Sequence, residues 1–246
     1  IDNSLYACEE AVTYKKEYVF YNEKSHKETR TQLDFEKDLI HAITKDKCKD
    51  FIVHYQPKVN ITKTICGMEA LVRWYNPKWN NPYSNLVPPD RFISSTEYLG
   101  LIKELGLWVL EQACQQTKEW QDKFEQFKNI QVAVNVSPSQ LTEEFVNQID
   151  EILKKTGLSP ESLELEITER ETVKGENIGI LDKILKRNIS IAIDDFGTDY
   201  SALSKLPKLK VTAVKLDKSY INEIHTDKDY EHLVKSTIDM VHGFKY

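Results

Sequence analysis

The chain has 246 residues, of which 40% are hydrophobic and 29% are charged, so it can form one large domain with a sizeable core. Its net charge of −6 argues against a broad DNA- or RNA-binding surface, and no run of about eighteen apolar residues is present for contact with a membrane. The four cysteines lie far apart without a Cys-x-x-Cys pair, which favours a reducing, cytoplasmic location over disulfides or a zinc site. A cytoplasmic location of this segment is compatible with a membrane tether elsewhere in a longer parent protein.

Residues 1–50 precede the main pattern of the chain. Residues 1–24 contain an apolar helix-then-strand pattern that is too short to fold alone. Residues 25–50 are polar and charged, with apolar side chains at roughly helical spacing, which predicts a connecting helix. The apolar positions are Leu33, Phe35, Leu39, Ile40 and Ile43.

From residue 51 the apolar pattern alternates between strands and helices. Strands are predicted at 51–60, 65–74, 130–136, 162–168, 189–193 and 211–216. Helices are predicted at 90–121 (broken near Gly100 and Gly106), 139–156, 177–186 and 219–241. The alternation predicts an α/β fold with a parallel sheet, and a (β/α)8 TIM-like barrel is the leading architecture. Because a complete barrel has about eight strands, this chain is expected to lack the last two.

Five of the predicted strands finish in a polar residue where the apolar pattern would otherwise continue. These residues are Glu69, Asn135, Glu166, the pair Asp194 and Asp195, and Lys215. In a parallel barrel the C-terminal strand ends converge on one face, so the side chains are expected to meet around one pocket. A single Asp-Asp pair is more often a helix cap, but polar residues at five equivalent positions favour a functional site.

The expected ligands at this face are oxygen atoms, which suit Mg²⁺ or Mn²⁺ better than zinc. Asp194 and Asp195 are suited to bridge two ions, the arrangement that activates water and stabilises a leaving oxygen in phosphodiester cleavage. Lys215 is expected to orient the attacking water or to neutralise charge on the phosphate.

Several motifs in unbroken order carry a resemblance to a known family. Met68-Glu69-Ala70-Leu71-Val72-Arg73-Trp74 resembles the signature of the EAL phosphodiesterases, which cleave the second messenger cyclic di-GMP. The resemblance covers roughly residues 33–246. Its other motifs are Tyr55-Gln56-Pro57, residues 87–93, Asn135-Val136-Ser137, residues 164–169, Asp194-Asp195-Phe196-Gly197-Thr198 and Lys215-Leu216-Asp217.

The resemblance implies an EAL-type TIM-like barrel that hydrolyses cyclic di-GMP to linear pGpG with two metal ions. It implies a first ion held by Glu69, Asn135, Glu166 and Asp194, and a second ion reached by Asp194 and Asp195. Lys215 is expected beside the nucleophilic water, so the catalytic set is Lys215, Asp195 and Glu69.

The resemblance also implies roles for three residues outside the ligand set. Gln56 and Arg73 are expected to bind the substrate. Glu169 is expected to anchor the loop after Asp195, which in this family helps to organise metal binding and the homodimer.

The expected domain division is residues 1–24, 25–50 and 51–246. Residues 1–24 resemble the end of a GGDEF domain, so an upstream GGDEF-like domain is an expected partner in the parent chain. Residues 25–50 are the linker helix, and residues 51–246 are a C-terminally incomplete EAL phosphodiesterase domain. The expectation of incompleteness rests on a family segment, Ala-Glu-Gly-Val-Glu, whose first glutamate is a metal ligand and which would follow Tyr246.

The sequence departs from the family pattern at a few positions. Asp199 stands in place of a glycine, Lys58 stands in place of an apolar residue, and the loop at 76–86 is longer than usual. Asp199 and the expected absence of the last glutamate keep a second hypothesis open, a cyclic di-GMP receptor with impaired catalysis. A purely structural dimerisation module is a third hypothesis, which the strand-end acids argue against.

Overall fold

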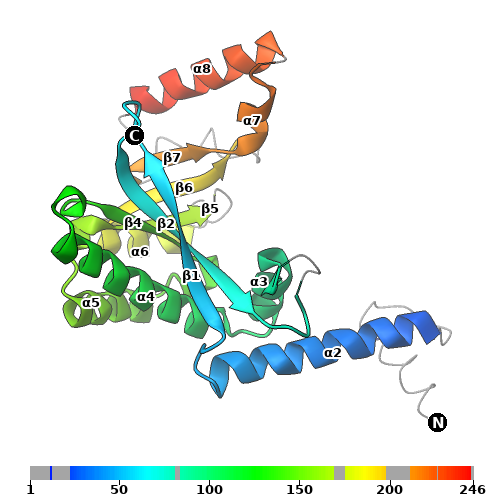
Figure 1. Cartoon of the computed structure of the whole chain (residues 1–246). Helices are drawn as coiled ribbons and strands as arrows, with labels where there is room; N and C mark the ends of the chain where they lie inside the picture. Colours follow the sequence, from blue (N-terminus) through cyan, green and yellow to red (C-terminus); the bar gives the residue numbers. More distant parts are fainter. Residues whose placement is uncertain are drawn as a thin grey trace. The chain divides into compact units, whose positions relative to one another are not determined.

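The structure is a computed structural model, and it describes residues 12, 23–80, 84–168, 175–197, 211–225 and 227–244. The chain divides into two compact units, one formed by residues 1–50 and 75–101 and the other by residues 51–74 and 102–246. Figure 1 shows the elements in chain order. Nearly all of the expected GGDEF-like remnant at residues 1–24 lies outside the described residues. In the described ranges no helix has the length and apolar character needed to cross a bilayer.

The first unit contains helix α2 (Glu23–Thr44), strand β3 (Leu86–Val87) and helix α3 (Pro89–Tyr98). Helix α2 is the helix predicted within residues 25–50, and it buries Phe35. The Phe35 ring packs edge-on against Trp79 with centroids 5.4 Å apart, and the Arg91 guanidinium lies 4.1 Å from the Phe35 centroid. The Trp79 indole N–H donates to Asp38 Oδ2 at 2.7 Å, so the buried ring keeps a hydrogen-bond partner.

The second unit is built on a sheet with the strand order β1-β2-β4-β5-β6-β7. The strands are β1 (Phe51–Val59), β2 (Ile65–Tyr75), β4 (Gln131–Asn135), β5 (Leu163–Thr168), β6 (Ser190–Phe196) and β7 (Ala213–Leu216). All neighbours from β2 to β7 are parallel, so the predicted α/β fold with a parallel sheet is confirmed. Strand β1 is antiparallel to β2, because the tight turn between them is too short for a parallel crossover.

Helices lie between the parallel strands of the second unit and after β7. They are α4 (Ile102–Lys123), α5 (Glu143–Thr156), α6 (Gly175–Leu185), α7 (Lys218–Glu223) and α8 (Lys228–Gly243), with short 3₁₀ turns η1 (Glu125–Phe127), η2 (Pro138–Gln140) and η3 (Pro160–Ser162). Strands β4, β5 and β6 each carry at least three buried residues, as is typical of parallel strands covered on both faces.

Helix α4 corrects one detail of the sequence prediction. A break was predicted near Gly106, but Gly106 lies within α4. A Cβ atom at this position would lie 2.2 Å from Nε2 of the buried Gln140, which belongs to η2. Gly106 therefore allows close packing between two elements and does not interrupt the helix. Near Gly100, which has φ of 72°, the predicted break does occur.

Candidate metal centre

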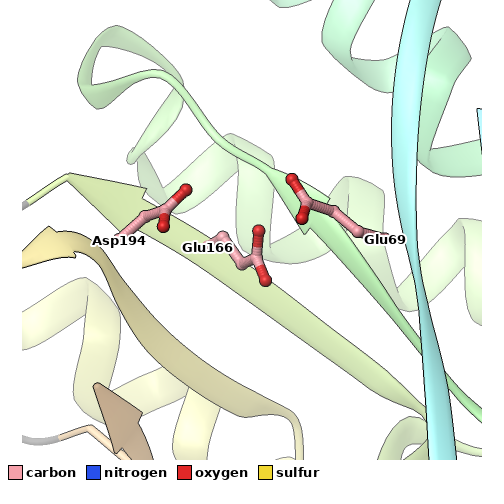
Figure 2. A group of neighbouring side chains, drawn as sticks. All are labelled: Glu69, Glu166 and Asp194. Carbon is pink, nitrogen blue, oxygen red and sulfur yellow. The ribbon is translucent and has the colours of Figure 1, made fainter. Parts of the chain in front are cut away.

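Three carboxylates from three strands converge in the second unit (Figure 2). Glu69 comes from β2, Glu166 from β5 and Asp194 from β6, and one oxygen atom of each lies within 4.8 Å of the others. The register staggers them regularly. Glu69 is level with Ala133 of β4, Glu166 is level with Asn135 two residues further along β4, and Asp194 is level with Thr168 two residues beyond Glu166. Glu69 therefore lies within β2 and not at its end as the sequence predicted, and the stagger of the parallel strands still brings the three carboxylates together.

The three carboxylates are shielded from solvent to different degrees. The Glu166 side chain is 0% exposed, whereas those of Glu69 and Asp194 are 18% and 22% exposed. Burial raises the pKa of Glu166 and the Glu69 charge adds to the increase, although Lys215 opposes it. Because burial is the largest cause, the raised pKa reflects the lost solvation of the Glu166 carboxylate, for which the neighbouring lysines compensate only in part. Three converging carboxylates supply the oxygen donors that a divalent cation such as Mg²⁺ or Mn²⁺ prefers.

Lys215 on β7 contacts all three members of the cluster. Its Nζ atom lies 2.7 Å from Glu166 Oε2, 3.1 Å from Asp194 Oδ1 and 3.4 Å from Glu69 Oε2. Burial lowers the pKa of Lys215, but these carboxylates outweigh burial and raise it above its usual value. The raised pKa keeps Lys215 as an ammonium at neutral pH, and it donates hydrogen bonds to the carboxylates.

Asn135 belongs to the same group of side chains. Its Nδ2 atom donates to Glu69 Oε1 at 3.0 Å across the pair of strands β2 and β4. The hydrogen bond brings two of the predicted metal ligands into direct contact.

Asp195 is oriented differently from its neighbour Asp194. The register between β6 and β7 is irregular from Ile193 to Phe196, and Asp195 has a left-handed φ of 53°. An irregularity of this kind redirects side chains at the end of a strand. Its backbone N–H donates to Asp194 Oδ1 at 3.0 Å. Burial raises the pKa of Asp195, and the Asp194 and Asp217 carboxylates raise it further.

The segment after Asp195 packs against the junction of β7 and α7. Gly197 has φ of 100°, and its carbonyl accepts a hydrogen bond from the Tyr220 hydroxyl. Asp217 caps α7 by accepting a hydrogen bond from the Ser219 backbone N–H at 2.8 Å. Two residues singled out in the sequence, Glu169 and Asp199, lie outside the described residues.

The sequence reasoning assigned no role to Lys58 and did not single out Glu164. Lys58 on β1 donates from Nζ to Glu164 Oε1, and to Glu166 Oε1 at 3.2 Å. Burial lowers the pKa of Lys58, but the Glu164 and Glu166 carboxylates raise it above its usual value. The period-two spacing of Glu164 and Glu166 shows in the sequence that both carboxylates stand on the same face of one strand, but it does not identify Lys58 as their partner.

The two predicted substrate-binding residues lie on the strands that carry the centre. Gln56 of β1 is directly opposite Glu69 of β2. Arg73 lies four residues beyond Glu69 on β2, and its Nη1 atom donates to the carbonyl of Val72 at 2.8 Å. A role for either residue in substrate binding remains a prediction.

Similar proteins include several whose names refer to signalling. The chain is 34% identical over 98% of its length to the signaling protein YkoW of Bacillus subtilis, and it covers 29% of that protein. It is 33% identical over 90% of its length to MucR of Pseudomonas aeruginosa, a bifunctional diguanylate cyclase/cyclic di-GMP phosphodiesterase, and it covers 31% of MucR. The chain thus spans about a third of these relatives.

Two solved structures have a similar fold. The EAL enzyme Bd1971, in a form with cAMP and cyclic di-GMP bound, has a TM-score of 0.79 and 30% sequence identity, covering 88% of this chain and 58% of Bd1971. The MucR phosphodiesterase in complex with cyclic di-GMP has a TM-score of 0.74 and 32% identity, covering 84% of this chain and 83% of the solved one. The predicted TIM-like fold class is confirmed by these neighbours.

A protein-family match covers most of the chain. The sequence profile of the EAL domain matches residues 36–246, which include every strand of the second unit and all the acidic residues of the cluster. With the strand-end carboxylates and the two solved EAL structures, this match shows that the chain belongs to the EAL domain family.

Proposed function

We propose that this chain is a metal-dependent phosphodiesterase that hydrolyses one phosphodiester bond of cyclic di-GMP and releases linear pGpG. The observation that carries the proposal is the cluster of Glu69, Glu166 and Asp194, whose oxygen atoms lie within 4.8 Å of one another in a member of the EAL domain family. The names of the relatives support the substrate, because MucR is called a cyclic di-GMP phosphodiesterase.

In this proposal Glu69, Asn135, Glu166 and Asp194 hold a first Mg²⁺ or Mn²⁺ ion, and Asp194 with Asp195 reaches a second. When bound, these ions supply Lewis-acid polarisation of the phosphate and a water of lowered pKa. The Glu166 side chain is fully buried, so bulk water does not reach it. The electrostatic interactions of its carboxylate are therefore stronger than they would be in solvent.

Lys215 has a defined part in this chemistry. It keeps its positive charge beside the carboxylates, so it orients the attacking water or donates to a phosphate oxygen on which negative charge develops. Gln56 and Arg73 bind the substrate, and Glu169 anchors the loop that follows Asp195.

The direct test is product formation by the purified protein. Incubation with cyclic di-GMP and Mg²⁺ or Mn²⁺ is expected to release pGpG, and both chelation of divalent ions and Glu69→Ala are expected to abolish release. Chromatographic separation of the nucleotides measures the outcome. Robust cleavage that persists in the presence of a chelator would contradict the metal-dependent mechanism.

A cyclic di-GMP receptor without catalysis is the second candidate. The contact of Lys58 with Glu166 favours it, because this ammonium group neutralises part of the acidic cluster and has no part in the proposed catalysis. Calorimetry that detects binding of cyclic di-GMP, together with no pGpG under saturating Mn²⁺, would support the receptor over the enzyme.

A further inference from the structure

Each oxygen atom of the buried Glu166 carboxylate contacts a different lysine. Oε2 accepts a hydrogen bond from Lys215 at 2.7 Å, and Oε1 accepts one from Lys58 at 3.2 Å. Lys215 also contacts the other two carboxylates of the cluster and is part of the centre. Lys58 comes from β1, which is at the opposite end of the strand order from β7. The contact between Lys58 and Glu166 therefore requires a separate explanation.

The path of the Lys58 side chain depends on a neighbouring glycine. Lys58 pairs with Gly67 in the ladder between β1 and β2. A Cβ atom on Gly67 would lie 3.5 Å from Cε and 3.8 Å from Cβ of Lys58, so the aliphatic stem lies directly against the glycine. The stem therefore passes over β2 without an intervening side chain and carries the ammonium toward β5.

Glu164 gives Lys58 a second partner outside the cluster. Lys58 Nζ donates to Glu164 Oε1 as well as to Glu166, and the Glu164 side chain is 12% exposed. A divalent ion held by Glu166 would be repelled by an ammonium on the same carboxylate. Lys58 can leave Glu166 and still keep a charge-assisted hydrogen bond with Glu164, which stands on the same face of β5.

We propose that Lys58 is a resident ammonium that competes with the divalent ion for Glu166, and that Glu164 holds Lys58 when the ion is bound. Lys58 is thus a positioning residue that sets the metal affinity of the centre. The inference rests on the proposed function, because it requires that this centre binds a metal ion. A purely structural ion pair between Lys58 and Glu164 would leave the metal affinity unchanged when Lys58 is replaced.

The test measures Mn²⁺ binding to the purified protein directly, by titration calorimetry without substrate. Lys58→Met keeps the apolar stem and removes the charge, and it is expected to tighten Mn²⁺ binding on the order of tenfold, since groups that contact metal ligands shift affinity by about 10–100-fold. Lys155→Met is the matched control, because Lys155 pairs with Glu111 at 2.6 Å on the surface of the same unit. The control is expected to bind Mn²⁺ as the wild type does.

A double-mutant cycle separates direct competition from the general effect of charge near the centre. Glu164→Gln is expected to weaken Mn²⁺ binding in the wild type, because Lys58 then has only Glu166 as a partner. In the Lys58→Met background the same change is expected to have a clearly smaller effect. Equal effects in the two backgrounds would mean that the charges act additively and would overturn the competition.

The outcomes distinguish the two proposals. Equal Mn²⁺ affinity of wild type and Lys58→Met overturns the role of Lys58 and leaves the proposed function standing. Absence of Mn²⁺ binding in every variant overturns the metal-dependent function itself. Lys58→Gln, with circular dichroism to verify folding, serves as a second variant, and it must also bind Mn²⁺ more tightly than wild type for the inference to hold.

Discussion

The Nζ atom of Lys215 lies 2.7 Å from Oε2 of Glu166, and this pair joins the last strand of the sheet to the most buried carboxylate of the centre. The two residues are separated by 49 positions in the sequence. Their contact makes β7 part of the centre and keeps a positive charge among the three acids.

Replacement of Lys215 tests whether that charge acts on the reaction. Lys215→Met is expected to lower kcat for cyclic di-GMP by roughly 10²–10³-fold, as is typical for loss of a donor to developing negative charge. Steady-state assays at saturating Mn²⁺ measure the change. A kcat equal to that of the wild type would exclude Lys215 from the reaction, and Lys155→Met provides the control for removal of an exposed lysine in the same unit.

Substitution of Asn135 tests the contact between the predicted metal ligands Asn135 and Glu69. Asn135→Ala removes the 3.0 Å hydrogen bond to Glu69 Oε1 and one predicted ligand oxygen. The Mn²⁺ concentration needed for half-maximal turnover is expected to rise on the order of tenfold or more. An unchanged requirement for Mn²⁺ would show that Asn135 neither binds the ion nor orients Glu69.

The raised pKa values of Glu166 and Asp195 predict how stability depends on pH. Burial is the main cause for both groups, so the folded state binds protons that the unfolded state releases above pH about 4. In protein free of divalent ions, this contribution to the free energy of unfolding is therefore expected to fall as pH rises through the raised pKa values. Added Mn²⁺ is expected to raise the free energy of unfolding by binding to the folded state, and most strongly at pH values where these carboxylates are ionised.

Urea unfolding at several pH values, with and without Mn²⁺, measures this dependence. Asp38 and Asp217 have lowered pKa values and contribute a slope of the opposite sign, so the comparison must be made with a variant. Glu166→Gln is expected to remove part of the decline with rising pH. If the variant and the wild type follow the same pH profile, the pKa of Glu166 is not raised in the folded protein.

Substitution of Gly197 tests whether the backbone conformation after the Asp194-Asp195 pair matters for stability and turnover. Gly197→Ala places a Cβ atom 2.8 Å from the Tyr220 ring at φ of 100°, and it is expected to lower the free energy of unfolding by about 1–3 kcal/mol. It should also lower turnover, because the displaced segment adjoins Asp195. Gly179→Ala is the control, since a Cβ there meets no atom within 4 Å, and it is expected to stabilise α6 by about 0.5–1 kcal/mol. Equal effects of the two substitutions on stability would contradict this prediction.

Much of the fold follows from local patterns in the sequence. The short apolar runs of β4 and β6 are buried on both faces, so these segments stand out as strands without knowledge of their neighbours. The misplaced break at Gly106 has a different origin. Its close approach to Gln140 is a tertiary contact, and a glycine required by packing cannot be distinguished in the sequence from one that ends a helix.

The sequence alone determined which strands carry Glu69, Asn135, Glu166, Asp194 and Lys215, and the parallel topology brings these strands side by side. Only the tertiary structure decided how the charges pair there. It gave Asp194 and Asp195 different surroundings, because Asp195 has a left-handed φ within an irregular stretch of the ladder. It also brought Lys58 to Glu166, since that contact depends on strand order and on the space that Gly67 leaves open, and neither is encoded in the residues around Lys58.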